Sequence, residues 1–469
     1  MESWLRDGFD LLQLVRHELL LFAAFWFIVG AADELAVDMR WLWLLMTGRG
    51  RSRRLPSGVE RMELAGRAAV IVPAWREADV IGAMISHTLQ AWSQRDFRLY
   101  VGCYCNDDAT LAAAIDAAGG DPRIRIVVHG AHGPTTKADC LNRLYEALSA
   151  DEARSGVPFR SVVMQDAEEM VHPAALLAID RGLEDADFVQ LPVRPELQKH
   201  SRWVAGHYAD EFIEAHAKDM VVRDSLGAAI PGAGVGCGFS RAALASLARM
   251  RRDGGEAGPF APDCLTEDYE MGVLVAREGG TGRFLRLRDS SGALVATRSF
   301  FPARLEDAVR QKTRWIHGIA FQGWDRLGWH ALPVELWMAL RDRRGPLTAL
   351  VLTIAYAQIL LEGVMLLGAA TGLHRPEPLS PLLATMVALT VTAFVWRALL
   401  RFGFTAREYG VAEGALAVLR IPIANLVAIL AGRRAFASYL RTLAGETVRW
   451  EKTAHDVHPA IALARAATA

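Results

Sequence analysis

Carboxylate side chains follow three predicted strands of this sequence, at the points where the strands end. Because the carboxyl ends of parallel strands meet at one edge of a sheet and ligands bind beyond that edge, we expect these side chains to lie close together. A single Asp or Glu is usually a solvated loop residue, but a series placed after buried strands favours a functional site. The carboxylates are Glu77 after segment 69–73, Asp107 and Asp108 after segment 98–104, and Asp166 and Glu168 after segment 161–165.

Asp166 and Glu168 have the spacing of a metal-binding pair, because side chains two positions apart on an extended strand end point to the same side. Carboxylates that converge repel one another unless a cation lies between them. Hard oxygen ligands suit Mg²⁺ or Mn²⁺, which proteins commonly bind through one or two carboxylates together with substrate phosphates. The pattern therefore predicts a site for a metal-bound diphosphate, with Glu77 and Asp107 nearby, as in the pocket for a nucleotide sugar.

Two further patterns lie in the second half of the chain. Thr266 and Asp268 begin a predicted helix, with Thr266 at the N-cap and Asp268 in the first turn. Taken alone, this pattern is equally an ordinary capping motif. Gln311, Arg314 and Trp315 share one face of a later helix, where an amide, a guanidinium and an aromatic plane suit a diphosphate and a sugar ring. The alternative is an amphipathic helix that Arg and Trp anchor at a membrane interface.

Strand and helix signals alternate through the region that carries these motifs. Short, fully apolar strands are typical of a parallel sheet covered on both faces, and repeated strand–helix units predict an open, doubly wound α/β sheet. The sequence lacks the glycine spacing of a Rossmann oxidoreductase after its first strand and has no P-loop, and its glycine-rich segment 231–238 fits neither motif. The predicted strands are 69–73, 98–104, 124–128 and 161–165, and the predicted helices are 78–92, 109–118 and 137–150.

Long apolar segments flank this region. Residues 19–32, with the mixed stretch before them, are long enough for one membrane span, and we interpret them as an uncleaved anchor. Residues 347–370 and 381–400 predict a membrane hairpin. Residues 411–431 contain two charged side chains, a proline and an asparagine, so we expect this stretch in the interface or packed against other helices.

The placement of arginine predicts the orientation, because Lys and Arg gather in cytoplasmic loops. Residues 48–346 and those after 401 are expected in the cytoplasm, with the N-terminus and the hairpin loop outside. The arginine clusters lie at 49–54, 341–344 and 401–407, whereas the loop 371–380 holds only Arg375.

Composition narrows the classes of protein. The 469 residues include 52 Lys and Arg against 53 Asp and Glu, so a nucleic-acid-binding protein that relies on bulk positive charge is disfavoured. An apolar fraction of 52% with 22% charged residues fits a soluble domain that carries a few membrane spans. Five cysteines without paired spacing argue against a disulfide framework and against a structural zinc site.

Taken in order, these residues resemble the family 2 inverting glycosyltransferases, in particular the membrane-embedded synthases related to cellulose and hyaluronan synthase. That group carries an early Asp, D-x-D, T-E-D and Q-x-x-R-W. The closer likeness is to the bacteriophage-adsorption protein B branch of the family, through the acidic segment 32–38 and segments 133–142 and 311–324. The matching residues here are Asp107, Asp166-Ala-Glu168, Thr266-Glu-Asp268 and Gln311-Lys-Thr-Arg314-Trp315.

The resemblance implies a GT-A-type, doubly wound, mostly parallel α/β sheet inserted between transmembrane helices, and transfer of a sugar from a UDP-sugar with inversion. Asp268 would be the general base, and Gln311, Arg314 and Trp315 would complete the catalytic face. Glu168 departs from the family pattern, because it replaces the second Asp of D-x-D with a longer side chain. By the resemblance, Asp166 and Glu168 hold Mg²⁺ or Mn²⁺, while Glu77, Asp107, Asp108, Lys137 and Asp166 bind the donor.

The expected organisation is a multi-pass protein of the bacterial inner membrane with a cytoplasmic catalytic domain. Its expected partners are the UDP-sugar, a glycan acceptor, membrane lipid and an export protein of the periplasm or outer membrane. Two alternatives stay open: a non-processive transferase that acts on a lipid-linked acceptor, and a catalytically silent envelope or phage-entry scaffold. The expected parts are an anchor at 1–47, a glycosyltransferase domain at 48–300, interface helices at 301–346, a hairpin at 347–401 and an interfacial or re-entrant helix with a tail at 402–469.

Overall fold

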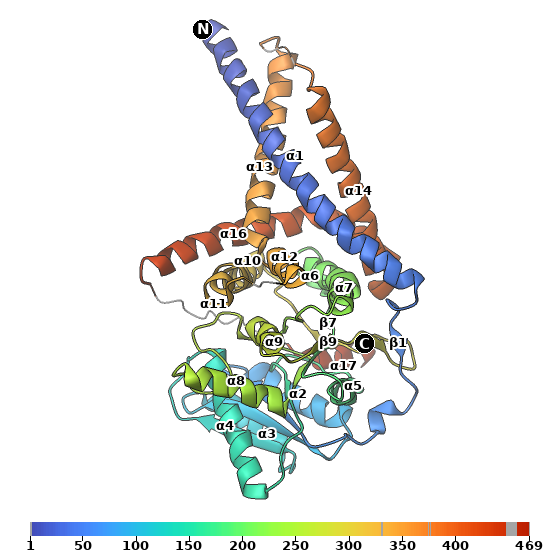
Figure 1. Ribbon diagram of the computed structural model, residues 1–469, viewed down its shortest axis with the longest axis vertical. Coiled ribbons are helices and arrows are strands. Elements are labelled where there is room, and N and C mark those ends of the chain that lie inside the picture. The colour runs from blue at the N-terminus through green and yellow to red at the C-terminus, as the bar shows by residue number, and fades with distance from the viewer. Residues whose placement is uncertain (1, 330–331, 374, 376, 447–456, 469) are drawn as a thin grey trace.

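The computed structural model of the chain describes residues 2–329, 332–373, 375, 377–446 and 457–468. Figure 1 shows an α/β domain below three long helices that extend away from it on one side. These helices are α1 (Glu2–Met46), α13 (Gly345–Ala370) and α14 (Pro381–Tyr409). Both α1 and α14 are longer than the apolar segments predicted for them: α1 extends past its segment at both ends, and α14 extends past its segment at the inner end. The inner ends of both helices pack on helices of the domain.

The centre of the domain is a sheet of seven strands in the order β4-β3-β2-β5-β8-β6-β9. Neighbours are parallel except at β8, which runs antiparallel to both β5 and β6. The predicted α/β class with a mostly parallel sheet is therefore confirmed. The strands are β2 (Ala68–Pro73), β3 (Phe97–Tyr104), β4 (Ile124–His129), β5 (Ser161–Met164), β6 (Phe188–Gln190), β8 (Cys237–Ser240) and β9 (Gly282–Phe284).

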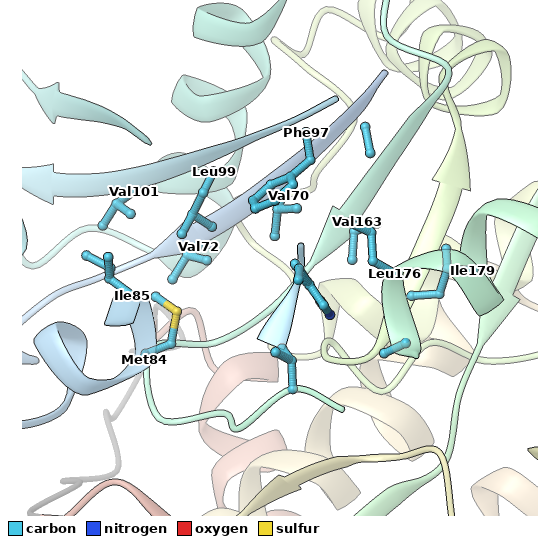
Figure 2. Close-up of a cluster of buried hydrophobic side chains, with 14 of the residues drawn as sticks. Val70, Val72, Met84, Ile85, Phe97, Leu99, Val101, Val163, Leu176 and Ile179 are labelled. Carbon is cyan, nitrogen blue, oxygen red and sulfur yellow. The ribbon is translucent and has the colours of Figure 1, made fainter. Parts of the chain in front are cut away.

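Side chains of β2 pack on both faces of this sheet, which explains its unbroken apolar sequence. Val70 and Val72 belong to a core that Figure 2 shows together with residues of α2 (Ala78–Ala91) and α5 (Ala175–Gly182). Ala69 and Ile71 belong to the opposite core, with residues of α4 (Lys137–Ser155) and α8 (Arg241–Asp253). Helices on both faces fix the strand ends in place, so the loops beyond them sit on a rigid frame.

A helical layer lies between the sheet and the long helices, as Figure 1 shows. Two of its helices contain a π-helical stretch, a feature that often marks functional sites. Two short parallel pairings, β1 with β10 and β7 with β11, lie outside the seven-stranded sheet. The layer consists of α6 (Val204–Glu214), η3 (Ala215–Asp219), α7 (Met220–Ser225), α9 (Glu267–Arg277), α10 (Leu305–Ile316), η4 (His317–Gln322), α11 (Gly323–Leu327) and α12 (Pro333–Arg343), with β1 (Arg53–Arg54), β7 (Val193–Pro195), β10 (Leu287–Arg288) and β11 (Thr297–Ser299).

Four helices of the described residues are long and apolar enough to cross a membrane: α1, α13, α14 and α16 (Ile421–Leu443). The stretch 411–431 is divided, because α15 (Val411–Leu419) ends before Arg420 and α16 begins after it. Arg420 is buried and bonded to Asp210 of α6 at 3.0 Å, which holds this junction against the helical layer. In Figure 1, α16 crosses below the lower part of α13 and lies transverse to it.

Ion pairs join the long helices to the domain. The buried ammonium group of Lys218 in η3 lies 2.8 Å from Asp38 and 3.3 Å from Glu34, both on α1. Arg397 of α14 reaches Glu34 at 2.7 Å and Glu214 of α6 at 2.8 Å. The acidic segment after the predicted anchor is thus the partner of basic side chains from three other elements, which also include Arg341 of α12. Charges this far from water require such pairing.

Candidate active site

A cavity of about 430 Å³ lies between the carboxyl ends of the central strands and α10. Its volume is in the range of sites that enclose a small ligand. The sequence-predicted residues at this cavity are Glu77, Lys137, Asp166, Glu168, Asp268, Gln311, Arg314 and Trp315.

The loop after β5 places three carboxylates at the cavity, and the third of them, Glu169, is almost fully buried. Asp166 and Glu168 line the cavity, and the Nζ atom of Lys137 lies 2.7 Å from Oδ1 of Asp166. Glu169 is buried, and its Oε2 accepts a hydrogen bond from the Thr297 hydroxyl at 2.6 Å. Burial, with the charge of Glu168 beside it, raises the pKa of Glu169 to about 8. Glu169 therefore anchors the loop that carries Asp166 and Glu168 at the cavity.

Asp166 and Glu168 fit a divalent cation that shares its coordination with a substrate. No group of three or more His, Cys, Asp or Glu side chains in the described residues could hold an ion alone. Two carboxylates on one loop are what Mg²⁺ requires when phosphate oxygens and water supply its other ligands. Lys137 lies 3.9 Å from Glu267 as well as bonding Asp166, so carboxylates outnumber cations in this corner of the cavity. That surplus of negative charge favours a cation.

Asp268 lies in the first turn of α9 and faces the cavity. Its Oδ1 accepts a hydrogen bond from the backbone N–H of Tyr269 at 2.8 Å. Burial raises the pKa of Asp268, and the positive charges of Lys137 and Arg314 oppose that effect. Burial also raises the pKa of the adjacent Glu267, to about 7. A carboxylate of raised pKa in a cavity is suited to accept a proton near neutral pH.

Thr266 is the N-cap residue of α9, as predicted, but its side chain does not cap the helix. Its hydroxyl makes no capping hydrogen bond and is buried without a partner among the described residues. Its side chain instead lies against Gly318: a Cβ on Gly318 would lie 2.5 Å from the hydroxyl oxygen of Thr266. Thr266 thus packs α9 against η4, the continuation of the helix that carries Arg314.

Glycines of segment 231–238 form the wall behind Asp268. A Cβ on Gly232 would lie 2.4 Å from the backbone oxygen of Asp268, and a Cβ on Gly234 would lie 2.4 Å from its Oδ2. Gly234 also has a φ of +76°, which favours glycine. Sequence reasoning noted this glycine run but gave it no role. Its signal was the density of glycine, which indicates close approach of backbone to another group.

Two ion-pair networks that sequence reasoning missed hold α9 in place. Glu270 accepts hydrogen bonds from Arg251 at 2.6 Å and from Arg326 at 2.7 Å, so it is unavailable as a base. The Tyr269 hydroxyl donates to Asp342 of α12 at 2.8 Å. Asp342 also lines the cavity, and it is paired with Arg223. These partners are far apart in the sequence, and no local sequence pattern predicts their contacts.

The three residues of Q-x-x-R-W face the cavity from α10. Oε1 of Gln311 is buried without a hydrogen-bond partner among the described residues, and it is therefore available to a ligand. Trp315 belongs to an aromatic group with Tyr208, Phe212 and Phe301; its ring centroid lies 6.0 Å from that of Tyr208 and 6.1 Å from that of Phe212. This wall is suited to the apolar face of a sugar ring.

The opposite end of the cavity lies at β2 and β3, where Trp75 and Tyr104 pack edge to face, 5.1 Å apart. Asp107 and Asp108 are not among the lining residues. Asp107 accepts hydrogen bonds from the backbone N–H groups of Arg76 at 2.6 Å and Thr110 at 3.4 Å, so it caps α3 (Asp108–Ala118). Asp108 is exposed. Asp107 therefore shapes the turn after β2, and the donor contacts expected of Asp107 and Asp108 stay predictions.

Fold and site together are those of a glycosyltransferase. The family described as glycosyltransferase like family 2 matches residues 65–318, which is more than half of the chain. The chain belongs to this glycosyltransferase family. The match covers the sheet, the acidic loop, α9 and α10.

Curated relatives and a solved structure agree with this assignment. Bacteriophage adsorption protein B of Escherichia coli K12 is 31% identical over 416 residues, which cover 83% of this chain and 54% of that protein. Bacteriophage N4 adsorption protein B of Escherichia coli O157:H7 gives the same figures. The chain thus spans about half the length of these relatives. The solved structure of the mannosyltransferase PcManGT from Pyrobaculum calidifontis, in complex with GDP-Man and Mn²⁺, covers 85% of this chain with a TM-score of 0.51 and 16% identity, and 99% of its own chain is matched. At that identity the likeness shows the fold alone, a GT-A-like fold, as expected.

Proposed function

We propose that this chain transfers a sugar from a UDP-sugar to a hydroxyl of a growing glycan, with inversion at the anomeric carbon. The observation that carries the proposal is a single cavity that combines the Asp166–Glu168 loop, Asp268 and the Arg314–Trp315 face of α10. Membership of a glycosyltransferase family supports it.

In the proposed reaction the acceptor oxygen attacks the anomeric carbon from the side opposite the diphosphate. Asp268 takes the proton from that hydroxyl as the new bond forms and the bond to the diphosphate breaks. A single displacement needs one base and no enzyme nucleophile, and it inverts the reacting carbon. Arg314 places a fixed positive charge toward the departing diphosphate, a contribution of about 3 kcal/mol for such preorganised groups. Trp315 supports the acceptor sugar.

Asp166 and Glu168 are the residues proposed to hold Mg²⁺ or Mn²⁺. When bound, the ion supplies positive charge to the diphosphate oxygens. Lys137 adds a cation beside the same loop, 2.7 Å from Asp166. Trp75 and Tyr104 offer aromatic surface to the nucleobase, next to Glu77. The archaeal structure with GDP-Man makes a guanosine donor the alternative to uridine.

The same proposal places the protein in the bacterial inner membrane, with its catalytic domain in the cytoplasm and the glycan extended processively toward an export partner. The arginine clusters support this orientation. The packing of α10 against α16 supports an acceptor that leaves beside the membrane helices. Chain length of the product on a labelled donor separates processive synthesis from a single addition to a lipid-linked acceptor.

The test uses membranes that contain the full chain, a panel of UDP-sugars and GDP-mannose, and release of the nucleoside diphosphate. We expect release with one UDP-sugar, dependent on Mn²⁺ or Mg²⁺, that falls at least tenfold in Asp166→Asn and Glu168→Gln. Asp116→Asn is the matched control, because that carboxylate is exposed on α3 and does not line the cavity. Full activity in excess EDTA contradicts the metal assignment. Absence of release with every donor contradicts the transferase assignment and favours the scaffold.

A further inference from the structure

The described part of the C-terminal segment, 457–468, contacts the acidic loop from behind the cavity. His458 is fully buried, and its Nε2 lies 3.1 Å from the backbone oxygen of Glu169. Its Nδ1 accepts a hydrogen bond from the backbone N–H of Ala460 at 3.1 Å, at the start of α17 (Pro459–Thr468). Because Nδ1 accepts, the neutral ring carries its proton on Nε2 and donates it to Glu169.

α17 is seated on the sheet domain. It packs against α2, and the ring of His458 lies 6.3 Å from that of His87 on α2. Nε2 of His87 in turn lies 2.9 Å from the backbone oxygen of Val171, one residue beyond the loop's bridge to β11 at Met170. Residues separated by nearly 300 positions in the sequence therefore meet at the loop that presents Asp166 and Glu168.

The remaining contacts of this loop lie on other sides. The carboxyl group of Glu169 is held by Thr297 of β11 at 2.6 Å, and Met170 exchanges backbone hydrogen bonds with Arg298. The N–H of Glu169 closes a turn onto the oxygen of Asp166 at 3.2 Å. β11 thus holds the carboxyl group of Glu169 and the N–H of the peptide that joins Glu169 to Met170, and His458 holds the carbonyl oxygen of the same peptide. With both, the turn that carries Glu168 has a defined shape.

We propose that His458 is a positioning residue, which holds the loop 166–169 in the conformation that receives the metal-bound donor. This inference rests on the proposed function of the site. His458 touches neither donor nor acceptor and acts through the Glu169 peptide. Segment 457–468 is, on this proposal, a docked clamp on the donor-binding loop.

The proposal predicts a particular kinetic signature. Without the hydrogen bond the loop samples other conformations, and the apparent affinity falls by the fraction of time spent in the competent one. A competent fraction of about one tenth raises KM for the donor and the half-saturating Mn²⁺ concentration about tenfold. Because the bound donor selects the competent loop, kcat stays within about twofold of wild type.

Three variants test this in the full chain. His458→Leu removes the hydrogen-bond donor at Nε2, whereas His458→Gln can restore an N–H near the position of that atom. Leu463→Ala is the matched control, because that side chain is 42% exposed on the same helix. We expect the tenfold rise in KM in His458→Leu alone, with at least partial rescue in His458→Gln. Hydrogen exchange of amides 166–170 gives a readout independent of activity: it should accelerate in His458→Leu and not in Leu463→Ala.

A second experiment separates positioning from folding. The chain truncated after Glu446 lacks the segment, and a synthetic peptide of residues 457–468 is added to it in trans. We expect the peptide to slow exchange at 166–170 and to restore the donor KM, in a saturable manner, whereas a peptide with His458→Leu does neither. If the KM for the sugar donor and the hydrogen exchange of amides 166–170 are unchanged in His458→Leu, this inference is wrong, and the activity of the wild-type chain still supports the proposed function. If the wild-type chain is inactive, the proposed function is wrong, and hydrogen exchange alone tests whether His458 holds the loop.

Discussion

Gly234 lies directly against the carboxylate of Asp268, so close that a Cβ on Gly234 would come within 2.4 Å of Oδ2. Gly234→Ala must therefore displace the carboxylate. A shift of about 1 Å at a reacting group can lower the rate about 10²-fold. We expect Gly234→Ala to lower kcat by about that factor in the nucleoside-diphosphate release assay.

Gly227→Ala is the control for that substitution. Gly227 has a φ of +67°, similar to the +76° of Gly234, but nothing lies within 4 Å of a Cβ built there. Both variants carry the backbone strain of a left-handed alanine, which is about 1–2 kcal/mol. If Gly227→Ala loses as much activity as Gly234→Ala, strain explains the loss and the contact with Asp268 does not.

Asp268 and Glu270 differ in what their substitution should change. Asp268→Asn keeps the shape of the side chain but cannot accept the proton, so we expect kcat to fall about 10²–10⁴-fold with normal expression. Glu270 is held by Arg251 and Arg326, so Glu270→Gln should mainly lower thermal stability. The measurements are initial rates and melting temperatures of both variants. If Asp268→Asn has the wild-type rate, then either Glu267 is the general base or the start of α9 has a purely structural role.

The raised pKa of Asp268 predicts a pH profile. The base is active when ionised, so kcat/KM should rise with pH, and burial moves that rise above the pH at which an exposed aspartate ionises. Lys137→Gln removes a positive charge that opposes the effect of burial on the pKa of Asp268, and the rise should move to higher pH. Rates from about pH 5 to 9 at saturating Mn²⁺ provide the measurement. A profile unaltered in Lys137→Gln would show that the rise belongs to another group.

Lys218 predicts a loss of stability without a role in chemistry. It is fully buried among carboxylates, with Asp38 at 2.8 Å and Glu34 at 3.3 Å. Lys218→Met leaves those charges without their central cation, which costs about 3–5 kcal/mol in buried pairs. Arg143→Met, in an exposed pair with Glu146, should cost at most about 1 kcal/mol. Unfolding in detergent, followed by tryptophan fluorescence, compares the two; equal losses would show that the cluster is not stabilising.

Reporter fusions test the orientation. A reporter joined after Gly410, past the end of α14, should behave as cytoplasmic, and one inserted at Leu379 in the hairpin loop as periplasmic. A periplasmic signal after Gly410 would reverse the orientation of the catalytic domain.

Patterns local in the sequence predicted the frame of the site well. The strands at 69–73 and 161–165 were recognisable because both faces of the sheet are covered, and the strand ends then placed Asp166 and Glu168 at the cavity. Gln311 and Trp315 followed from helical spacing.

Contacts between distant segments were beyond such reasoning. Asp107 follows a strand as Asp166 does, and only the folded turn that contains Arg76 shows that its carboxylate accepts hydrogen bonds from two backbone N–H groups. The clamp of His458 on Glu169 spans 289 positions and has no local signature. Residues 447–456, part of the expected cytoplasmic tail, lie outside the described residues.

Two parts of the chain build the cavity, because α10 contributes Gln311, Arg314 and Trp315 and the sheet domain contributes the carboxylates. A soluble fragment that ends near residue 300 would retain Lys137, Asp166, Glu168 and Asp268 and could still hold a nucleotide, but it would lack the face that meets the leaving group and the acceptor. Since α10 rests on α16, assembly of the complete cavity depends on the seating of that helix. The turnover rate of this protein would then depend on the lipid around α16, so its activity should be measured in reconstituted bilayers.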